Sequence, residues 1–237
     1  MVNPEIKTQK FIIKYFTEIM IKGSTAKRQM IAQVYNNLNN MLSKISSDIK
    51  IKKFFDKVEV VCPIEVVVLV RQRLLDTPGI QQILEAIQFD NMYTLDEIKV
   101  KVSEICASEI QGKTFVIRAK RTGTQDFKST QIEQTVGGYM LAMNDTKGVA
   151  LKGAEYTINL ELEFAQLNVI THKHMGMGGF PIGSQGSILS LMSGGFDSTV
   201  ASYLTMKRGI KTHFIFFNLG GIAHEIGVKQ VAYYLWN

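Results

Sequence analysis

The sequence contains little cysteine, little proline and no long apolar run. Its 237 residues include 2 cysteines and 4 prolines. Two cysteines cannot form a disulfide framework or a four-ligand zinc site. The most apolar stretch, residues 58–70, is interrupted by Glu59, Pro63 and Glu65, whereas a membrane span needs roughly 18 uninterrupted apolar residues. The first ten residues also lack the apolar core of a signal peptide. We therefore expect a cytoplasmic, folded protein without a membrane segment.

The basic residues are distributed unevenly along the chain. Residues 1–75 contain 13 Lys and Arg against 6 Asp and Glu, and residues 111–128 contain 5 against 1, although the net charge of the whole chain is only +6. Clustered basic residues favour a polyanionic partner, because each side chain that neutralises a phosphate releases counterions. A solvated surface explains the same pattern equally well. Charge alone therefore leaves open whether these residues meet nucleic acid.

Apolar periodicity and turn residues indicate two successive α+β units. In the first unit we expect a helix that is capped by Ser24, a helix over residues 63–75, and strands at residues 10–16, 49–55 and 57–62. In the second unit we expect a helix begun by the capping box of Thr94 and Glu97, a helix opened by Thr130 and Glu133, and strands at residues 79–89, 114–120, 156–164 and 166–174.

A glycine-rich break at residues 176–186 precedes a third part of different character. Residues 188–192 and 212–220 read as strands, and each is followed by a helix, the first through residue 206 and the second over residues 223–237. This βαβα order is typical of the start of a doubly wound parallel sheet.

The segment Ser193–Ser198, with the sequence SGGFDS, lies between the first of these strands and its helix. Glycines let backbone N–H groups approach an anion closely, serine hydroxyls add donors, and the helix N-terminus carries positive potential. Asp197 does not attract a phosphate, but it could hold a Mg²⁺ ion that also binds phosphate oxygens. Neither GxxxxGK[ST] nor GxGxxG is present, and His224–Glu225 is not an HExxH zinc motif because residue 228 is Val.

SGGFDS matches the SGGxDS signature of the PP-loop ATP pyrophosphatases, which this segment resembles. The surrounding sequence resembles one PP-loop family in particular, the tRNA 4-thiouridine synthetases, over essentially the whole chain and in the same order. That resemblance rests on five segments: KFIIKYFTEIMIKG (10–23), TPGIQQIL (77–84), GKTFVIRAKRTGTQDF (112–127), GGFPIGSQGSILSLMSGGFDS (178–198) and FFNLGGIAHEIGVKQVAYYLWN (216–237).

The resemblance implies a multidomain α+β and α/β architecture. Its parts are an N-terminal ferredoxin-like domain over residues 1–67, a THUMP RNA-binding domain over residues 68–174, and an incomplete PP-loop domain with a doubly wound parallel sheet over residues 175–237. It also implies ATP and Mg²⁺ as cofactors, and as partners tRNA, a cysteine desulfurase that donates sulfur, and in some cases a second copy of the chain as a homodimer.

The resemblance further implies a reaction and its residues. ATP adenylates the uracil O4 of uridine 8 with release of pyrophosphate, and a persulfide sulfur then displaces AMP. The resemblance also implies that the family supplies sulfur for thiamine thiazole synthesis. Asp197 is the catalytic and Mg²⁺-binding candidate. The candidates for ATP binding are Leu191, Met192, Ser193, Gly194, Gly195, Asp197, Ser198, Phe216 and Phe217.

RNA contact is expected at two basic clusters. Arg118, Lys120 and Arg121 match a basic strand end of the THUMP segment, and Lys22, Lys27 and Arg28 lie at the start of the first long helix. Cys62 and Cys106 are interpreted as buried core residues, so we expect the chain as given to lack the sulfur-carrying cysteine. Two alternatives remain open: a catalytically incomplete tRNA-binding protein, and a PP-loop synthetase that acts on a small molecule.

Overall fold

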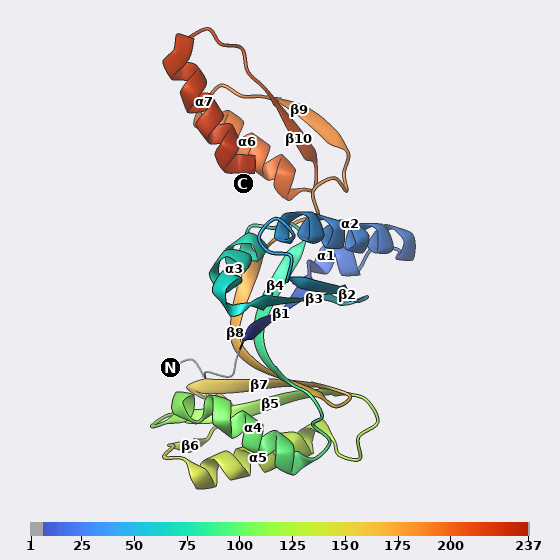
Figure 1. Ribbon diagram of the computed structural model, residues 1–237, viewed down its shortest axis with the longest axis vertical. Helices are drawn as coiled ribbons and strands as arrows, with labels where there is room; N and C mark the ends of the chain where they lie inside the picture. The colour runs from blue at the N-terminus through green and yellow to red at the C-terminus, as the bar shows by residue number, and fades with distance from the viewer. Residues whose placement is uncertain (1–6, 237) are drawn as a thin grey trace. The chain divides into compact units, whose positions relative to one another are not determined.

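The computed structural model describes residues 7–236 (Figure 1). Residues 1–6, which form part of the segment without a signal-peptide core, lie outside the described residues. The chain divides into two compact units. One runs up to Ile83 and continues from His174 onward, and the other is Leu84–Lys173. No helix within residues 7–236 is both long enough and apolar enough to cross a bilayer.

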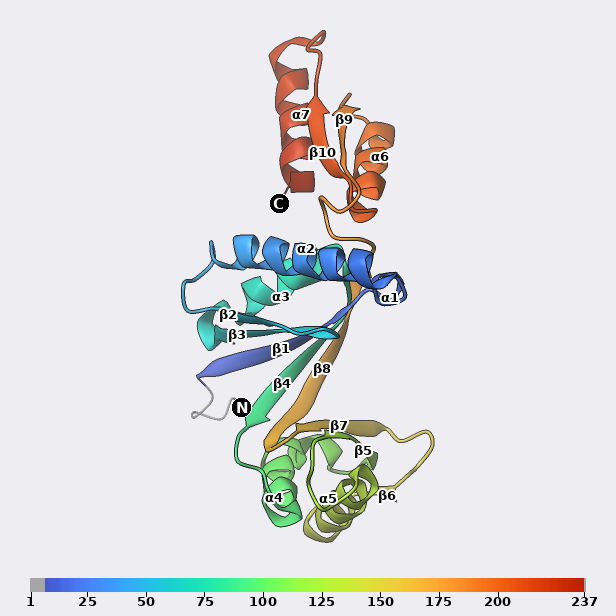
Figure 2. The same ribbon diagram turned by 90° about the vertical axis from the view of Figure 1, so that its right-hand side faces the viewer.

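The first unit begins with four strands in the order β2-β3-β1-β4, of which β3 is antiparallel to both β1 and β2. Helices α2 and α3 lie on one face of these strands (Figure 2). The elements are β1 (Thr8–Tyr15), α1 (Thr17–Met20), α2 (Ser24–Leu42), β2 (Lys50–Lys53), β3 (Lys57–Pro63), the 3-10 turn η1 (Ile64–Val66), α3 (Val67–Leu75) and β4 (Ile80–Phe89).

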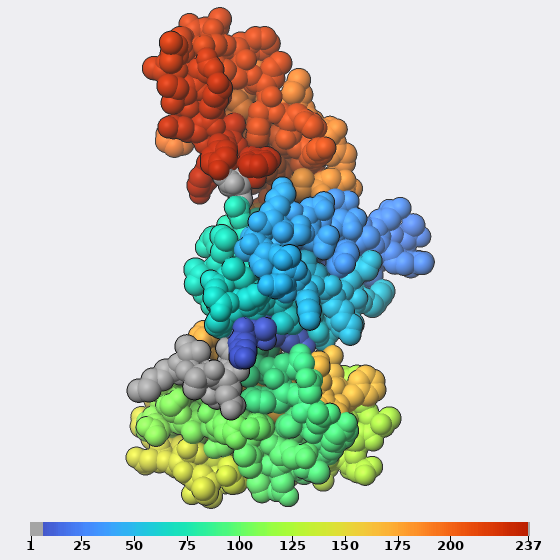
Figure 3. Space-filling model, in the orientation of Figure 1, coloured from blue at the N-terminus to red at the C-terminus, as the bar shows by residue number. Residues whose placement is uncertain are grey.

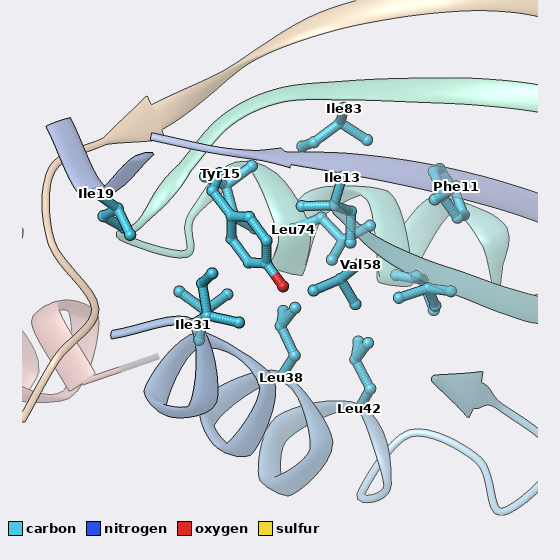
Figure 4. Close-up of a cluster of buried hydrophobic side chains, with 14 of the residues drawn as sticks. Phe11, Ile13, Tyr15, Ile19, Ile31, Leu38, Leu42, Val58, Leu74 and Ile83 are labelled. Atoms are coloured by element: carbon cyan, nitrogen blue, oxygen red, sulfur yellow. The ribbon is translucent and has the colours of Figure 1, made fainter. Parts of the chain in front are cut away.

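The core of this part lies between α2 and the sheet (Figure 4). Val34, Leu38 and Leu42 recur at helical spacing and are fully buried, so α2 presents one apolar stripe to the strands. Each such side chain contributes roughly 1.5–3 kcal/mol when it is removed from water. Tyr15 lies among them, and its hydroxyl donates to the carbonyl oxygen of Lys57 at 3.1 Å. Burial raises the pKa of Tyr15 well above its ordinary value.

Helix α3 packs in this first core. Val67, Val70 and Leu74 belong to the same buried cluster as Leu38, and Ile80 at the start of β4 joins them. The division expected after residue 67 therefore separates α3 from the residues against which it packs. The physical reason is that the apolar run beyond Pro63 forms a helix with one buried face, and this face needs a sheet to cover.

The second unit has the strand order β8-β7-β5-β6, with β5 parallel to β7 and to β6, and β7 antiparallel to β8. Helices α4 and α5 cover one face of these strands (Figure 1). The elements are α4 (Leu95–Cys106), the 3-10 turn η2 (Ser108–Ile110), β5 (Thr114–Thr122), α5 (Ser129–Met143), β6 (Gly148–Val149), β7 (Tyr156–Glu163) and β8 (Gln166–Gly178). Strands β4 and β8 each contain residues of both units.

The helix caps test the turn chemistry expected from the sequence. The capping box of Thr94 and Glu97 is confirmed, since each side chain accepts from the backbone of the other residue. Two other expected caps are wrong. Helix α2 is preceded by Gly23, so Ser24 is its first helical residue. Helix α5 begins at Ser129, one residue before Thr130. The backbone N–H of Lys128 donates to the side-chain oxygen of Gln131.

Residues beyond the glycine-rich break form the expected βαβα arrangement. Strands β9 (Ser187–Leu191) and β10 (Lys211–Ile215) are parallel, and α6 (Phe196–Lys207) and α7 (Gly221–Trp236) follow them. The second strand is shorter than the sequence suggests, because it ends at Ile215 rather than at residue 220. The side chains of α7, in red, lie at the surface in the space-filling view (Figure 3). Apolar residues exposed on this helix include Ile222, Ile226, Tyr233, Tyr234 and Trp236.

Candidate functional site

Residues 193–198, here called the SGGFDS loop, comprise part of the connection after β9 and the first turn of α6. Met192 donates its backbone N–H to the carbonyl oxygen of Ile215 at 2.8 Å. This bond holds the end of β9 beside the end of β10. The carboxyl ends of two parallel strands therefore meet here, which is where open parallel sheets bind ligands.

Serine hydroxyls fix the shape of the SGGFDS loop. The hydroxyl groups of Ser193 and Ser198 lie 3.1 Å apart. Ser198 Oγ also accepts from the backbone N–H of Ser193 at 3.3 Å and donates to the carbonyl oxygen of Gly195 at 3.2 Å. Thr199 Oγ1 donates to the same Gly195 oxygen at 2.9 Å. The backbone is thus held in a compact turn at the positive end of α6.

Gly194 has a backbone conformation that only glycine adopts without strain. Its φ is +80°, in the left-handed region. A Cβ atom at this position would lie 3.0 Å from Cγ2 of Val228 on α7. Left-handed glycine next to residues of right-handed or extended conformation is typical of the backbone concavities that bind anions. The loop residues Ser193, Gly194 and Gly195 are all exposed, so a phosphate group can reach them.

Asp197 lies in the first turn of α6 with an exposed side chain. Within residues 7–236, no group of three His, Cys, Asp or Glu residues is arranged to hold a metal ion. A single carboxylate suits Mg²⁺ when phosphate oxygens and waters supply its other ligands. The donor set therefore fits a Mg²⁺ ion that arrives with a polyphosphate, and it does not fit a metal held by the protein alone.

The apolar nucleotide candidates differ in how accessible they are. The side chain of Leu191 is 58% exposed and that of Phe217 is 64% exposed, whereas Met192 is only 1% exposed. The Met192 sulfur accepts from the buried Ser202 hydroxyl at 3.4 Å. Met192 therefore supports the loop from inside the fold, and its side chain does not face the loop opening. Phe216 is half-buried and directly follows β10.

His224 is a residue of this site that the sequence analysis did not assign. Its Nε2 atom lies 2.9 Å from the carbonyl oxygen of Ser193, and its ring meets that of Phe216 edge-to-face at 5.0 Å. The sequence held a usable signal. His224 lies near the start of the helix that follows the second parallel strand, and such helix starts gather at the same sheet edge as the first loop.

Arg118 and Lys120 lie on the face of β5 opposite to α4 and α5. They alternate with Ile117 and Ala119, which contribute to the core beneath the helices. Both basic side chains are exposed, and Arg118 donates to the carbonyl oxygen of Leu151 at 2.7 Å. The two residues therefore form a pair of exposed positive charges on one strand.

Lys173 adds a third positive charge on the β8 strand. Its ammonium group donates to Asn159 Oδ1 on β7 at 2.7 Å. Burial lowers the pKa of Lys173, the positive charge of Lys120 lowers it further, and the carboxylate of Glu161 partly opposes both effects. Such mutual repulsion between Lys120 and Lys173 would be relieved by an anion.

The other basic candidates have different surroundings. Arg121 points to the opposite side of β5, where its guanidinium donates to the carbonyl oxygen of Gly123 at 2.8 Å and so anchors the turn after the strand. Lys22 and Lys27 lie over the rings of Phe180 and Phe55, respectively. Arg28 is exposed on α2. The structure therefore separates Arg121, which is half-buried on the helix-covered side of β5, from the exposed pair Arg118 and Lys120.

Both cysteines are buried. Cys62 belongs to the core of the first unit and Cys106 to the core of the second. Burial raises the pKa of the Cys106 thiol to about 12, with a further contribution from the charge of Glu109. A thiol that stays protonated and covered is a poor nucleophile. The interpretation of both residues as core residues agrees with this geometry.

Comparison with protein families assigns most of the chain. The model described as "ThiI ferredoxin-like domain" matches residues 10–83, the THUMP domain model matches residues 93–169, and the model described as "Thiamine biosynthesis protein (ThiI)" matches residues 183–237. The tRNA sulfurtransferases of Shewanella oneidensis and Shewanella amazonensis are each 42% identical over 230 residues. These alignments include 96% of this chain and 47% of each relative, so the chain spans about half the length of the curated relatives it matches.

Two solved structures share the fold. A Pyrococcus horikoshii protein, PH1313, is similar with a TM-score of 0.79 and 20% identity over 96% of this chain and 75% of that one. A 4-thiouridine synthetase in complex with RNA and bound ATP has a TM-score of 0.77 and 21% identity over 95% of this chain and 57% of that one. At these identities the similarity establishes the architecture, a ferredoxin-like part, a THUMP domain and a PP-loop part.

Proposed function

The chain belongs to the ThiI family, and on that premise we propose that it takes part in the ATP-dependent transfer of sulfur to uridine 8 of tRNA. In the proposed reaction, the uracil O4 attacks the α-phosphorus of ATP and pyrophosphate leaves. The terminal sulfur of a persulfide then bonds to C4 of the ring, and AMP leaves with the oxygen. A second thiol would attack the remaining S–S bond, so that a disulfide forms and the sulfur stays on C4. The SGGFDS loop would bind the phosphates, and the exposed basic pair on β5 would contact RNA.

One observation carries this proposal: the left-handed Gly194 in a serine-rich loop at the N-terminus of α6, set at the carboxyl edge of two parallel strands. That arrangement suits a polyphosphate. Asp197 would hold Mg²⁺ against the phosphate oxygens. The names of the matched relatives and the RNA and ATP of the 4-thiouridine synthetase structure support tRNA and ATP as the ligands.

The proposal extends to partners that the family suggests. A cysteine desulfurase would supply the sulfur, as the family resemblance implies. Cys62 and Cys106 are covered and so are poorly placed to carry it. The same sulfur could be delivered to thiamine thiazole synthesis, for which the family model is named. The exposed apolar residues of α7 are compatible with a homodimer. A second candidate function is tRNA binding without catalysis, and it is favoured by the exposed pair Arg118 and Lys120 on the THUMP segment.

Replacing Asp197 by asparagine is expected to separate nucleotide binding from RNA binding. Asparagine keeps the size of the side chain but has no negative charge, so it binds Mg²⁺ weakly. We expect the gain in ATP affinity that Mg²⁺ provides to fall by about tenfold, which corresponds to roughly 1.4 kcal/mol. Isothermal titration of the chain with ATP in the presence and absence of Mg²⁺ measures this change.

The affinity of the same variant for tRNA is expected to stay unchanged, because Asp197 and the β5 pair belong to different parts of the chain. An equal loss of ATP and tRNA binding would contradict this division of roles. Ser187→Ala is a suitable control, since it changes an exposed residue at the start of β9, away from the SGGFDS loop.

Replacing both Arg118 and Lys120 by alanine is expected to weaken tRNA binding by about tenfold at moderate salt. Each phosphate contact that is lost also lowers the slope of log affinity against log salt concentration by roughly 0.9, so the double variant should show a shallower salt dependence. Fluorescence anisotropy with labelled tRNA at several salt concentrations tests both expectations.

Lys99→Ala provides the matched control for charge. Lys99 is also a basic residue of the second unit, but it lies on α4 and pairs with Asp96, on the face of the sheet that the helices cover. We expect its removal to leave the salt slope unchanged. A fall in slope as large as that of the double variant would assign the salt dependence to net charge and not to the β5 pair.

A further inference from the structure

We propose that His224 is a positioning residue for the SGGFDS loop: by donating to the Ser193 carbonyl oxygen, it turns the Gly194 N–H toward the phosphate. This inference rests on the proposed binding of ATP by that loop. It assigns a role to a histidine that is not part of a zinc motif and lies on α7, after the second strand.

The contact is a hydrogen bond of ordinary length. His224 Nε2 lies 2.9 Å from the Ser193 oxygen. Because a carbonyl oxygen can only accept, Nε2 carries the proton in this arrangement. The bond joins residues 31 positions apart in the sequence, so it ties the start of α7 to the loop between β9 and α6.

The planar peptide bond transmits this contact to the next residue. In a trans peptide the C=O of one residue and the N–H of the following residue point in opposite directions. The Ser193 oxygen points to His224, and the Gly194 N–H therefore points away from α7. The neighbouring donors are already engaged within the loop, since the N–H groups of Ser193 and Gly195 donate to Ser198 Oγ and Ser193 Oγ.

Two residues that precede α7, Phe216 and Gly220, lie close to the imidazole ring. Phe216 meets it edge-to-face. A Cβ atom at Gly220 would lie 2.7 Å from His224 Nδ1, so only glycine allows the chain to pass this close to the ring. Val228, one turn further along α7, lies beneath Gly194 and is buried. The start of α7 thus forms a support that makes a polar contact with the loop through the His224 hydrogen bond.

Two substitutions separate the hydrogen bond from ring packing. His224→Phe keeps an aromatic ring against Phe216 but removes the donor. His224→Gln loses the ring and keeps an N–H donor at a similar reach. A single hydrogen bond contributes roughly 0.5–1.5 kcal/mol, so its loss should weaken ATP binding by about threefold to tenfold. The affinity of the full chain for Mg²⁺–ATP is measured by isothermal titration for the wild type and both variants.

A second measurement needs no ligand. The amide signal of Gly194 in a ¹H–¹⁵N spectrum reports the orientation of its peptide group in the free chain. We expect this signal to move in His224→Phe and to stay near its wild-type position in His224→Gln. Thermal unfolding of both variants is recorded alongside, to identify any general loss of structure.

Weaker ATP binding in the Phe variant, with recovery in the Gln variant, supports the positioning role. Equal affinity in the Phe variant and the wild type overturns it. Equal weakening in both variants also overturns it, since restoring an N–H donor at residue 224 would then not restore ATP binding. Absence of ATP binding by the wild-type chain would instead refute the proposed function of the loop, and the Gly194 signal alone would then decide whether the His224 bond orients the peptide.

Discussion

Gly194→Ala is expected to reduce ATP binding by about a hundredfold or more. Alanine in the left-handed region costs roughly 1–2 kcal/mol, and its Cβ would lie 3.0 Å from Val228 Cγ2, so the loop must move. Movement of the loop displaces backbone N–H groups that would bind a charged phosphate, and hydrogen bonds to charged groups contribute roughly 1.5–3 kcal/mol each. Isothermal titration with Mg²⁺–ATP measures the loss.

Gly227→Ala is the matched control, because it lies in α7 and a Cβ atom there meets nothing within 4 Å. Alanine favours the helix by about 1 kcal/mol over glycine, so ATP binding should be unchanged. Val228→Ala in the Gly194→Ala background removes the close contact but not the backbone strain, and we expect partial recovery of affinity. Full ATP affinity in the single Gly194→Ala variant would refute the assignment of phosphate binding to this loop.

Glu59→Gln is expected to cause the largest loss of stability. The Glu59 carboxylate lies 3.0 Å from the Lys10 ammonium and 2.9 Å from the Lys57 ammonium, and both lysine side chains are 3% exposed. Glutamine leaves these buried positive charges without the carboxylate that faces them. Removal of one partner from a buried ion pair costs about 3–5 kcal/mol. We expect a value near 3 kcal/mol, since the Glu59 side chain retains 11% of its exposure.

The stability contribution of Glu59 should also depend on pH. Burial alone would raise the pKa of Glu59, but the hydrogen bonds and charges of Lys57 and Lys10 outweigh burial and hold it below its ordinary value of 4.5. A carboxylate with a lowered pKa in the folded state stabilises the protein above its unfolded-state pKa, and this stabilisation is lost as the pH falls through the folded-state value. Between pH 7 and pH 3, the difference between wild type and variant should therefore be constant at first and shrink below about pH 4.5.

Denaturant unfolding at several pH values measures this difference. Glu104→Gln serves as the control, because its ion pair with Lys101 is 37% to 43% exposed and surface pairs contribute about 0–1 kcal/mol. A Glu59→Gln variant as stable as this control would show that the buried lysines find compensation elsewhere.

Local signals in the sequence predicted the parts of the fold that local chemistry decides. The capping box at Thr94 and the helical spacing of Val34, Leu38 and Leu42 identified α4 and α2, because each depends on residues three or four apart. The SGGFDS motif placed the glycine-rich loop between a strand and a helix, as found. The roles of its residues in ATP binding remain predictions.

Features that depend on distant residues were not predictable in the same way. His224 meets Ser193 because β9 and β10 pair in parallel. The βαβα order predicts that pairing, but no pattern of neighbouring residues indicates which side chain of α7 reaches the loop. Met192 shows the converse case, since proximity to the loop in sequence did not indicate that its side chain is turned inward. The unexpected cap of α5 has a similar origin: Glu133 is engaged by the Ala119 N–H on β5 and so is not available to begin a helix.

Each of the two units contains one buried thiol, which can report when the core around it opens. Cys62 lies in one core and Cys106 in the other, and a covered thiol reacts with an alkylating reagent only when the surrounding structure opens. The rate at which each sulfur is alkylated therefore measures how often its own core opens, and no engineered label is needed. Peptide mapping of the alkylated protein can thus follow two local opening equilibria in a single sample.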